Sequence, residues 1–583
     1  MQSKYEWDFG LLYKTEEDRK KDLEFFKLAI KDIKNFEGKL NNKKDIVEYL
    51  KATETLMKKV YRLDLYAMMK MDQDSTSAEN VRISDVLMNL ITEYSVASAF
   101  VSPELSANSN EFLLELQNDK ELSDYKRFFE AVIREKQHTL SKDKEELLAG
   151  ISNFTDFSEL FEKLANVEIK FDDIIDKDGN HLPLTNSTYT QYVLSEDAEI
   201  RRQGHENLHK GFAKYNLTLS NNFVNFLKKC DFIAKTYNFK SQFEKSLFGE
   251  EVSQAVYDKL VENVRNNLPL YQQELKEKAK CLGMEKLAIS DVIAPVGKPK
   301  NNIAYEDAVK IVLDMVKVMG EDYHSVASTY FNNRSIDVYP KEGKRSGAYS
   351  ASAQIGQQFM LLNYDGTYNS VSTLAHELGH TMHSYFSEKT QPYFTQDYVI
   401  FVAEVASTVN EVLLANKLMK ESQDKEERRF LAESILNEFN SSVFRQTMFS
   451  EFEQFAHGEI NQGNPVSFEE LNNKYASLQN EYFGDSVNLH EFAKFEWSRI
   501  PHFYRRFYVY KYATGFVAAV SIASNIEKYG ADYVKNNYIK FLSAGSSMDP
   551  VSILKLANVD ITSDEPYKNA FKFYSDMIKI INE

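Results

Sequence analysis

The most chemically specific stretch of the sequence is His376-Glu377-Leu378-Gly379-His380, which contains two imidazoles and one carboxylate. On a helix, residues four apart lie one turn above each other, about 6 Å along the axis. His376 and His380 could therefore both bind one zinc ion, at about 2.0–2.1 Å from each ligating nitrogen. Glu377 lies at an adjacent angle on the helix, where its carboxylate could hold the metal's water. This spacing favours hydrolysis by a zinc-activated water.

The residues around this motif predict the helix that it needs. Between Tyr368 and Glu388, apolar residues recur at helical spacing: Val371, Leu374, Ala375, Leu378, Met382 and Tyr385. The alternative interpretation is a surface helix with incidental histidines. The helical apolar stripe around the motif favours the metal site.

A third ligand must come from another part of the chain. His383 lies two turns after His376, about 10.5 Å along the axis, which is too far for one ion while the helix continues. The metzincin pattern also requires Gly and His where this sequence has His383 and Phe386. Glu404 is the better candidate, because its neighbours are apolar and an ionised carboxylate among them needs a cation.

Glu411 follows Glu404 by two helical turns and is predicted to support the site without binding the metal. The alternative for both residues is a solvated position on an amphipathic helix. Two His ligands and one Glu ligand leave a fourth position open for water, as in catalytic rather than structural zinc sites. We therefore expect one Zn²⁺ per chain, held by His376, His380 and Glu404.

Composition restricts the class of protein. A chain of 583 residues exceeds a single ordinary core, so two or more lobes are expected. The net charge of −17 argues against nucleic-acid and anionic-membrane partners. Two cysteines exclude a disulfide scaffold, and the sequence contains neither a signal-peptide pattern nor an apolar run long enough to span a membrane. These features predict a cytoplasmic protein.

The fold is predicted to be mainly α, since only 21 Gly and 11 Pro interrupt long amphipathic stretches. Helical patterns cover residues 16–140, 141–170, 195–240, 250–285 and 303–335, with a loop at 291–300. One exception precedes the metal motif, where residues 358–363 predict a short strand. The edge of that strand could pair with an extended peptide, or the strand could simply support the helix.

An aromatic segment near the C-terminus, residues 500–515, contains His502 and four tyrosines. Tyr504, Tyr508 and Tyr512 recur every four residues and would share one helical face. Residues at this spacing are often part of a core. However, Tyr O–H and His N–H groups can also stabilise the oxyanion that forms during peptide hydrolysis.

Four segments together resemble the thimet-oligopeptidase-type zinc metallopeptidases of the M3 family, and among them the oligoendopeptidase F branch. They are residues 343–349, residues 374–380 with His383, residues 401–407 with Glu411, and His502 with residues 507–515. Their order and spacing agree with that family. The resemblance implies a helical, two-lobed protein with a small β-sheet beside the H-E-x-x-H helix and a deep substrate channel. It also implies endopeptidase action on short unfolded peptides.

Carried over residue by residue, the resemblance makes His376, His380 and Glu404 the zinc ligands and Glu377 the catalytic carboxylate. It makes His502, Tyr508 and Tyr512 contacts to substrate or transition state. We expect residues 1–190 to form a helical N-terminal region and residues 191–583 the catalytic zinc peptidase region, with both lobes contributing to the channel. In thermolysin-like enzymes an Asp four residues beyond the ligand Glu orients a ligand His. Here that position is Thr408, so Ser407 and Glu411 are the candidates for this role.

Two other functions remain compatible with the residues. A helical zinc carboxypeptidase or dipeptidase would use the same motif with a cationic pocket for a peptide terminus, for which Lys344, Arg345, Arg505 and Arg506 are candidates. A catalytically silent peptide-binding protein is the second alternative. The presence of every residue that the chemistry needs weighs against the silent alternative.

Overall fold

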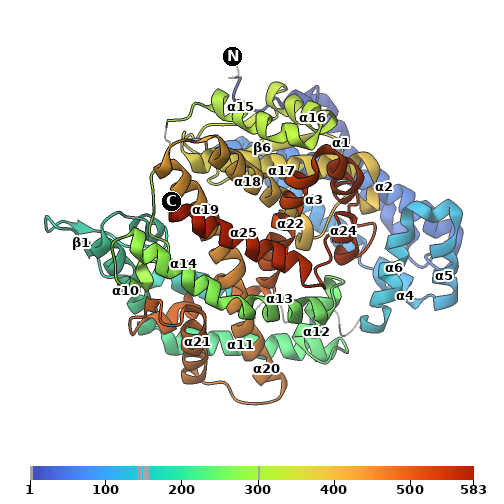
Figure 1. Ribbon diagram of the computed structural model, residues 1–583. Coiled ribbons are helices and arrows are strands. Elements are labelled where there is room, and N and C mark those ends of the chain that lie inside the picture. Colours follow the sequence, from blue (N-terminus) through green and yellow to red (C-terminus); the bar gives the residue numbers. More distant parts are fainter. Residues whose placement is uncertain (1–3, 142–143, 145–146, 149–155, 300–301) are drawn as a thin grey trace. The chain divides into compact units, whose positions relative to one another are not determined.

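The structure is a computed structural model, and it describes all residues except 1–3, 142–143, 145–146, 149–155 and 300–301. The described chain is mainly helical with a few short strands, which confirms the predicted fold class (Figure 1). Part of the predicted helical stretch 141–170 lies outside the described residues. None of the helices within the described ranges is long and apolar enough to cross a lipid bilayer.

The chain forms two compact units, each assembled from segments far apart in the sequence. The first unit comprises Met1–Lys142, Lys300–Leu414 and Ile522–Val559, and the second comprises Asp143–Pro299, Ala415–Ser521 and Asp560–Glu583. Helices α18 (Ile400–Glu421) and α22 (Tyr510–Tyr533) contribute residues to both units.

The first unit contains α1 (Glu16–Asp32), α2 (Lys43–Gln73), α3 (Ala78–Ala97), α4 (Val101–Ala107), α5 (Asn110–Asn118), α6 (Lys126–Glu135), α15 (Tyr305–Met315), α16 (Glu321–Asn332), α17 (Tyr368–Thr390), α23 (Ile539–Leu542), α24 (Pro550–Leu556), β4 (Ile336–Asp337), β5 (Tyr349–Ser352) and β6 (Gln358–Leu361). The second unit contains α8 (Phe157–Lys163), α9 (Tyr189–Val193), α10 (Ala198–Lys214), α11 (Asn216–Thr236), α12 (Gln242–Gly249), α13 (Gln254–Asn266), α14 (Leu268–Cys281), α19 (Lys425–Phe439), α20 (Arg445–Asn461), α21 (Phe468–Phe483), α25 (Glu565–Ile581), β1 (Ile174–Ile175), β2 (His181–Leu182), β3 (Leu287–Ala288) and β7 (Val487–Asn488).

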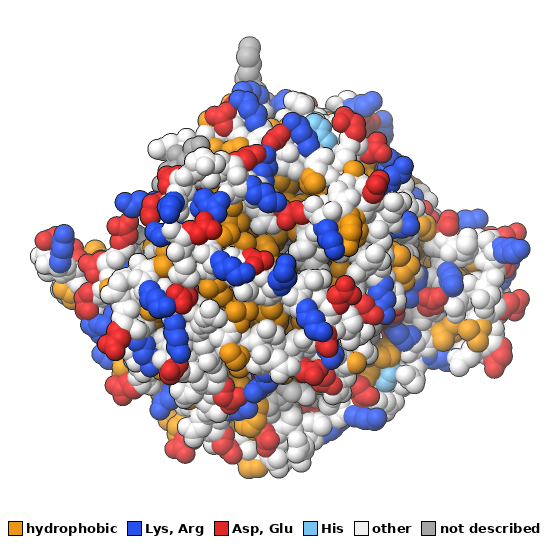
Figure 2. All heavy atoms as spheres, viewed as in Figure 1, with side chains coloured by type: hydrophobic (Ala, Val, Ile, Leu, Met, Phe, Trp, Pro, Cys, Tyr) orange, Lys and Arg blue, Asp and Glu red, His pale blue; other side chains and the backbone are white. Residues whose placement is uncertain are grey.

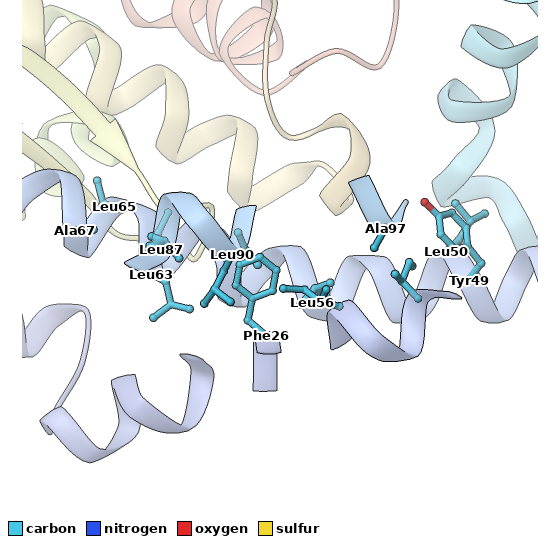
Figure 3. Close-up of a cluster of buried hydrophobic side chains, with 14 of the residues drawn as sticks. Phe26, Tyr49, Leu50, Leu56, Leu63, Leu65, Ala67, Leu87, Leu90 and Ala97 are labelled. Atoms are coloured by element: carbon cyan, nitrogen blue, oxygen red, sulfur yellow. The ribbon is translucent and has the colours of Figure 1, made fainter. Parts of the chain in front are cut away.

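The N-terminal helices of the first unit share one apolar core with the sheet that precedes the metal motif. Helices α1, α2 and α3 supply residues such as Phe26, Leu63 and Leu90 (Figure 3). Phe359 and Leu361 of β6 belong to the same cluster. Burying each such side chain contributes about 1.5–3 kcal/mol. The packing of the chain's first hundred residues therefore also supports β6.

The predicted strand exists as β6, but its position in the sheet differs from the prediction. The strand order is β4-β6-β5, with β4 parallel and β5 antiparallel to β6. Because both edges of β6 are paired, the prediction that a peptide could add to this strand is wrong. The outer edge of β5, where Tyr349 pairs inward with Leu361, has no strand beside it among the described residues.

Side chains connect this sheet to α17. The hydroxyls of Ser350 on β5 and Thr381 on α17 lie 2.8 Å apart. The carboxylate of Glu388 accepts hydrogen bonds from the Ser352 hydroxyl and, at 2.8 Å, from the Gly356 N–H. Helices α15 and α16 also contact α17 (Figure 1). The helix that carries the metal motif is thus held by both sheet and helices.

The aromatic segment of the second unit does not form the continuous helix that was predicted. A 3₁₀ helix ends at Arg505, Arg506 and Phe507 are left-handed with φ of 52° and 58°, and α22 begins at Tyr510. Tyr504 therefore does not share a face with Tyr508 and Tyr512. Its ring stacks on Phe161 at a centroid distance of 5.0 Å.

Glu453 of α20 holds this left-handed turn. Its carboxylate, which is fully buried, accepts a hydrogen bond from the Phe507 N–H at 2.5 Å. A bulky aromatic residue in the left-handed region is strained by about 1–3 kcal/mol, so the turn persists only where neighbouring contacts enforce it. Burial raises the pKa of Glu453 to about 8, although the Phe507 N–H and Lys511 oppose this shift.

Charged side chains of both signs are interspersed over the face of the molecule in Figure 2. The net charge of −17 is not gathered into one acidic patch on that face.

The variant Glu453→Gln should change how stability depends on pH. The folded protein keeps a proton on Glu453 up to a pH of about 8, whereas the unfolded chain loses it near the ordinary pKa of 4.5. The wild-type protein therefore loses stability as the pH rises through this window, and the uncharged Gln does not. Urea unfolding at pH 5.5 and 8.5 should show the variant gaining stability relative to wild type at the higher pH. The control is Glu459→Gln, which changes a half-buried glutamate on the same helix. If both variants showed the same change of stability with pH, the raised pKa of Glu453 would not be its cause.

Candidate metal centre

The motif residues lie on α17 as predicted. The helix begins after Thr367, whose hydroxyl accepts a hydrogen bond from the Ser370 N–H at 3.3 Å. The predicted stripe is buried at Val371, Leu374, Ala375, Leu378 and Met382, while Tyr385 is only partly buried and Phe386 takes the buried place beside it. This burial fixes the direction in which the two histidines project.

Three ligand atoms converge on one point. The Nε2 atoms of His376 and His380 are 3.2 Å apart. The Oε2 atom of Glu404, on α18, lies 3.4 Å from the first and 3.3 Å from the second. Four tetrahedral bonds of about 2.0–2.1 Å place ligand atoms about 3.4 Å from one another. The triangle therefore has the dimensions of three corners of a zinc coordination sphere.

The two imidazole rings also have a suitable relative orientation. Their planes are inclined at 77°. A nitrogen lone pair lies in the plane of its ring. Two inclined rings can therefore both direct a lone pair at a metal ion that lies where their planes intersect. The side chains are partly accessible, with exposed fractions of 26% for His376, 18% for His380 and 43% for Glu404. Glu404 is thus less buried than predicted, because it projects away from the buried apolar face of α18 that contains Val402 and Val405.

Two further residues orient the ligands. The Nδ1 atom of His376 lies 3.2 Å from the Glu411 carboxylate, which leaves its Nε2 lone pair available. The Ser407 hydroxyl lies 3.1 Å from Glu404 Oε2 and donates to the Glu404 carbonyl at 2.8 Å. Ser407 and Glu411, the two residues that the sequence suggested for a supporting role, therefore each contact a candidate ligand. Ser407 contacts Glu404, and Glu411 contacts His376.

The electrostatics of the site favour a positive charge. Burial alone would lower the pKa of His376, but hydrogen bonds to Glu404 and Glu411 raise it to about 11. Burial likewise opposes ionisation of Glu404, yet the hydrogen bonds from both histidines hold its pKa far below the ordinary range. A divalent cation supplies the positive charge that these carboxylates favour, and it would displace the proton from His376.

Glu377 occupies a more enclosed position than the candidate ligands. Its side chain is buried, and its Oε2 atom has no hydrogen-bond partner among the described residues. Burial raises the pKa of Glu377, while the two neighbouring histidines lower it. A buried carboxylate oxygen without a protein partner is suited to a water molecule.

Gly379 allows the third ligand to reach the first two. A methyl group at this position would lie 2.5 Å from the Ala406 carbonyl oxygen and 2.7 Å from the Ser407 backbone nitrogen. Helix α18 therefore crosses α17 with its backbone directly over Gly379. The Asn410 side chain strengthens the crossing by donating to the Ala375 carbonyl at 2.9 Å. A glycine inside a helix costs about 1 kcal/mol relative to alanine, which is a sequence signal for such a close approach.

His383 is not part of the candidate metal centre. Its ring is fully buried and stacks on Tyr398 with a centroid distance of 3.7 Å and an interplanar angle of 4°. Burial lowers its pKa to about 3, so the imidazole is neutral. The exclusion of a metzincin-type third His agrees with this packing.

His502, Tyr508 and Tyr512 form their own cluster in the second compact unit. The ring centroids are 6.3 Å apart for His502 and Tyr508, 6.0 Å for His502 and Tyr512, and 5.2 Å for the two tyrosines. All three side chains are partly exposed. The left-handed turn at Arg506 and Phe507 brings Tyr508 beside His502.

Replacing Gly379 by alanine should weaken metal binding without altering any candidate ligand. The added methyl group must displace the α18 backbone, and with it Glu404. We expect a loss of about 10–100-fold in zinc affinity, the range typical of changes beside metal ligands. Competition with a chromogenic chelator measures this affinity. Gly458→Ala on α20 is the matched control, because a methyl group there meets nothing within 4 Å. Equal zinc affinity in the two variants would show that the helix crossing does not set the ligand geometry.

Comparison with known proteins identifies the family. The model of peptidase family M3 matches residues 191–573, and that of Oligopeptidase F matches residues 104–171. The chain is 36% identical to Oligopeptidase PepF of Bacillus subtilis, over 99% of this chain and 87% of that protein. It is 35% identical to an oligoendopeptidase F homolog of Borreliella burgdorferi, over 99% of this chain and 98% of that protein.

Solved structures agree with this assignment. A crystal structure from Chlamydophila abortus has a TM-score of 0.94 and 31% identity, covering 100% of this chain and 98% of that one. The crystal structure of oligoendopeptidase-F from Enterococcus faecium has a TM-score of 0.74 and 28% identity, and the match covers 97% of this chain and 98% of that one. This chain therefore belongs to peptidase family M3 and is an oligoendopeptidase F-like metalloendopeptidase.

Proposed function

We propose that this protein uses one zinc ion, held by His376, His380 and Glu404, to hydrolyse internal bonds of short unfolded peptides. The observation that carries the proposal is the triangle of ligand atoms with sides of 3.2–3.4 Å. Two imidazole nitrogens and one carboxylate suit zinc better than magnesium or calcium, which prefer oxygen ligands only. Glu411 and Ser407 would keep the ligands oriented.

A zinc ion at this place would act as a Lewis acid and lower the pKa of a bound water towards about 7. Glu377 would accept the proton of the attacking water and deliver it to the leaving amine. Its buried, unpartnered Oε2 atom supports this role. The enclosure of Glu377 also excludes bulk water, which would otherwise compete for the same oxygen.

We assign His502, Tyr508 and Tyr512 to contacts with the substrate or the developing oxyanion. Burial, followed by the charge of Arg505, lowers the pKa of His502, so its ring is a neutral N–H donor. Losing one oxyanion donor typically costs about 2.7–4 kcal/mol, or 10²–10³-fold in turnover. The outer edge of β5 could align the peptide main chain, because it presents unpaired backbone groups.

For two of the four candidate cations, Lys344 and Arg345, the structure argues against the cationic pocket that a carboxypeptidase or dipeptidase needs. The side chain of Lys344 is buried, and its ammonium is 2.6 Å from the Asp337 carboxylate, so its charge is already neutralised. Arg345 faces Asp72 at 3.4 Å. Neither residue is available as an uncompensated cation for a peptide terminus. A silent binding protein would not need Glu377 beside a complete ligand triangle.

We place this activity in the cytoplasm. Cys230 and Cys281 are both free, which is usual in a reducing compartment. Short peptides are the partners that the family assignment supports.

The proposal is tested with a short peptide that is blocked at both ends. The wild-type protein should cleave it at an internal bond, at a rate similar to that of the free peptide. Glu377→Gln should retain zinc but lose turnover by about 10²–10⁴-fold, the usual contribution of a general base. Mass spectrometry locates the cut, and elemental analysis gives the zinc content. Cleavage of the free peptide alone would indicate an exopeptidase, and near-normal turnover in Glu377→Gln would remove it as the base.

Replacing the two acidic residues of α18 should separate a ligand from a supporting residue. Glu411→Ala should weaken zinc binding by about 10–100-fold, because it only orients His376. Glu404→Ala should weaken it further, because it removes a metal–oxygen bond. Zinc affinity is measured at limiting metal with both folded variants. The reverse order of the two effects would make Glu411 the ligand.

A further inference from the structure

A cavity of about 260 Å³ lies within the second compact unit and is built from residues other than those of the metal centre. Its polar wall contains His205, Arg445, Glu496 and Arg499. Most of the remaining wall is apolar, with Val193, Ile289, Val292, Ile293, Met448 and Phe483, and Asn437, Asn440 and Ser441 add polar side chains to it. A cavity of this kind accepts a small molecule with an apolar body and one polar end.

The charges of the polar wall leave an excess of one positive charge. Arg445 donates to Glu496, and the Tyr475 hydroxyl donates to the same carboxylate at 2.8 Å. Burial alone would raise the pKa of Glu496, but Arg445 lowers it to about 2 and keeps it ionised. One carboxylate thus faces two guanidinium groups. The side chain of Arg445 keeps 39% of its surface accessible although it forms this ion pair.

Arg499 is the less completely paired of the two guanidinium groups. Its side chain is only 20% exposed, and its closest approach to Glu496 is 4.0 Å. Its guanidinium lies over the Tyr189 ring at 5.1 Å, and it donates no hydrogen bond to any residue that the structure describes. A guanidinium has five N–H donors and retains its charge at any ordinary pH. An enclosed guanidinium whose donors lack protein acceptors indicates an anionic ligand.

His205 adds a donor to the same wall, as the tautomers of its neighbours show. The Phe492 N–H donates to His490 Nδ1 at 3.2 Å, so a neutral His490 carries its proton on Nε2. That Nε2 lies 2.8 Å from His205 Nδ1, which must then accept. Burial, together with the nearby histidines, lowers the pKa of His205 and keeps it neutral. Its remaining proton is therefore on Nε2.

His205, His209 and His490 lie close enough together to suggest a metal site, but their geometry is unsuitable for one. The rings of His205 and His209 are stacked at 4.2 Å with an interplanar angle of 25°. Lone pairs in two nearly parallel planes do not converge on one ion, in contrast to the inclined rings of His376 and His380. The Nε2 of His490 is also protonated. His490 and His205 are therefore joined by a hydrogen bond and are not arranged to bind a metal.

We propose that the cavity binds a small organic monocarboxylate with an apolar body, its carboxylate paired with Arg499 and its body against the apolar wall. Arg445 and His205 supply further donors to the same anion. An engineered cavity of about 150 Å³ holds benzene, so this one accommodates roughly ten non-hydrogen atoms. A single negative charge balances the wall, whereas a phosphate dianion would overcompensate it and would not use the apolar surface.

Calorimetric titration of the full-length protein with 3-phenylpropionate tests this proposal, with the uncharged 3-phenylpropionamide as the matched ligand. The titration is run on zinc-loaded and on chelator-treated protein, because a carboxylate can also bind a metal ion. We expect binding that persists after metal removal, at least tenfold weaker binding of the amide, and at least tenfold weaker binding of the acid to Arg499→Gln. Arg202→Gln is the control, because Arg202 is exposed and paired with Glu199 and Glu206.

Four results would overturn the proposal. Binding that disappears with the metal would place the carboxylate on the metal instead. Equal affinity for acid and amide, or for Arg499→Gln and Arg202→Gln, would remove Arg499 as the recognition group. Tighter binding of inorganic phosphate than of the acid would exclude the monocarboxylate class. The readout is binding to metal-free protein, so it is independent of peptide hydrolysis.

Discussion

The close crossing of α18 over α17 at Gly379 is the contact on which the metal centre depends. The two histidines are one turn apart on the same helix, so local structure alone brings them together. The third ligand is 24 residues further along the chain after His380 and reaches the same point only because the Ala406 and Ser407 backbone lies directly over a glycine. Protein interiors are close-packed and poorly compressible, so a displaced backbone would carry the Glu404 carboxylate with it.

The surroundings of this crossing keep it in place. The Asn410 amide joins the two helices, and the small sheet is tied to α17 through Thr381 and Glu388. The sheet in turn shares its core with α1, α2 and α3, which are more than two hundred residues away in the sequence. Carboxylates on α18 approach both imidazoles, and Ser407 and Glu411 constrain the directions of Glu404 and His376. Geometry and charge thus favour a cation at the same point.

Two histidine clusters among the described residues show how ring orientation separates metal binding from hydrogen bonding. Both clusters contain histidines four residues apart on a helix. At His376 and His380 the planes are inclined at 77°, whereas at His205 and His209 they are 25° apart. In the second case a backbone N–H also fixes the tautomer of His490. Spacing in the sequence is the same in both clusters, so the environment of each ring decides its chemistry.

The sequence by itself determined the helical class, the position of the metal motif on a helix and the short strand before it, because these follow from local periodicity and spacing. It also identified Glu404 as a candidate, because this carboxylate has apolar neighbours, and Glu411, because it follows two helical turns later. The predicted division at residue 190 stays a prediction, as does the channel between lobes. Only the tertiary structure decided that both edges of β6 are paired and that Tyr504 leaves the face of Tyr508 and Tyr512. It also placed Arg499 in a cavity wall, with no hydrogen-bond acceptor among the described residues. These features depend on contacts between residues far apart in the chain and on a left-handed turn held by Glu453. Such contacts and such a turn leave no periodic pattern in the sequence, so local spacing could not predict them.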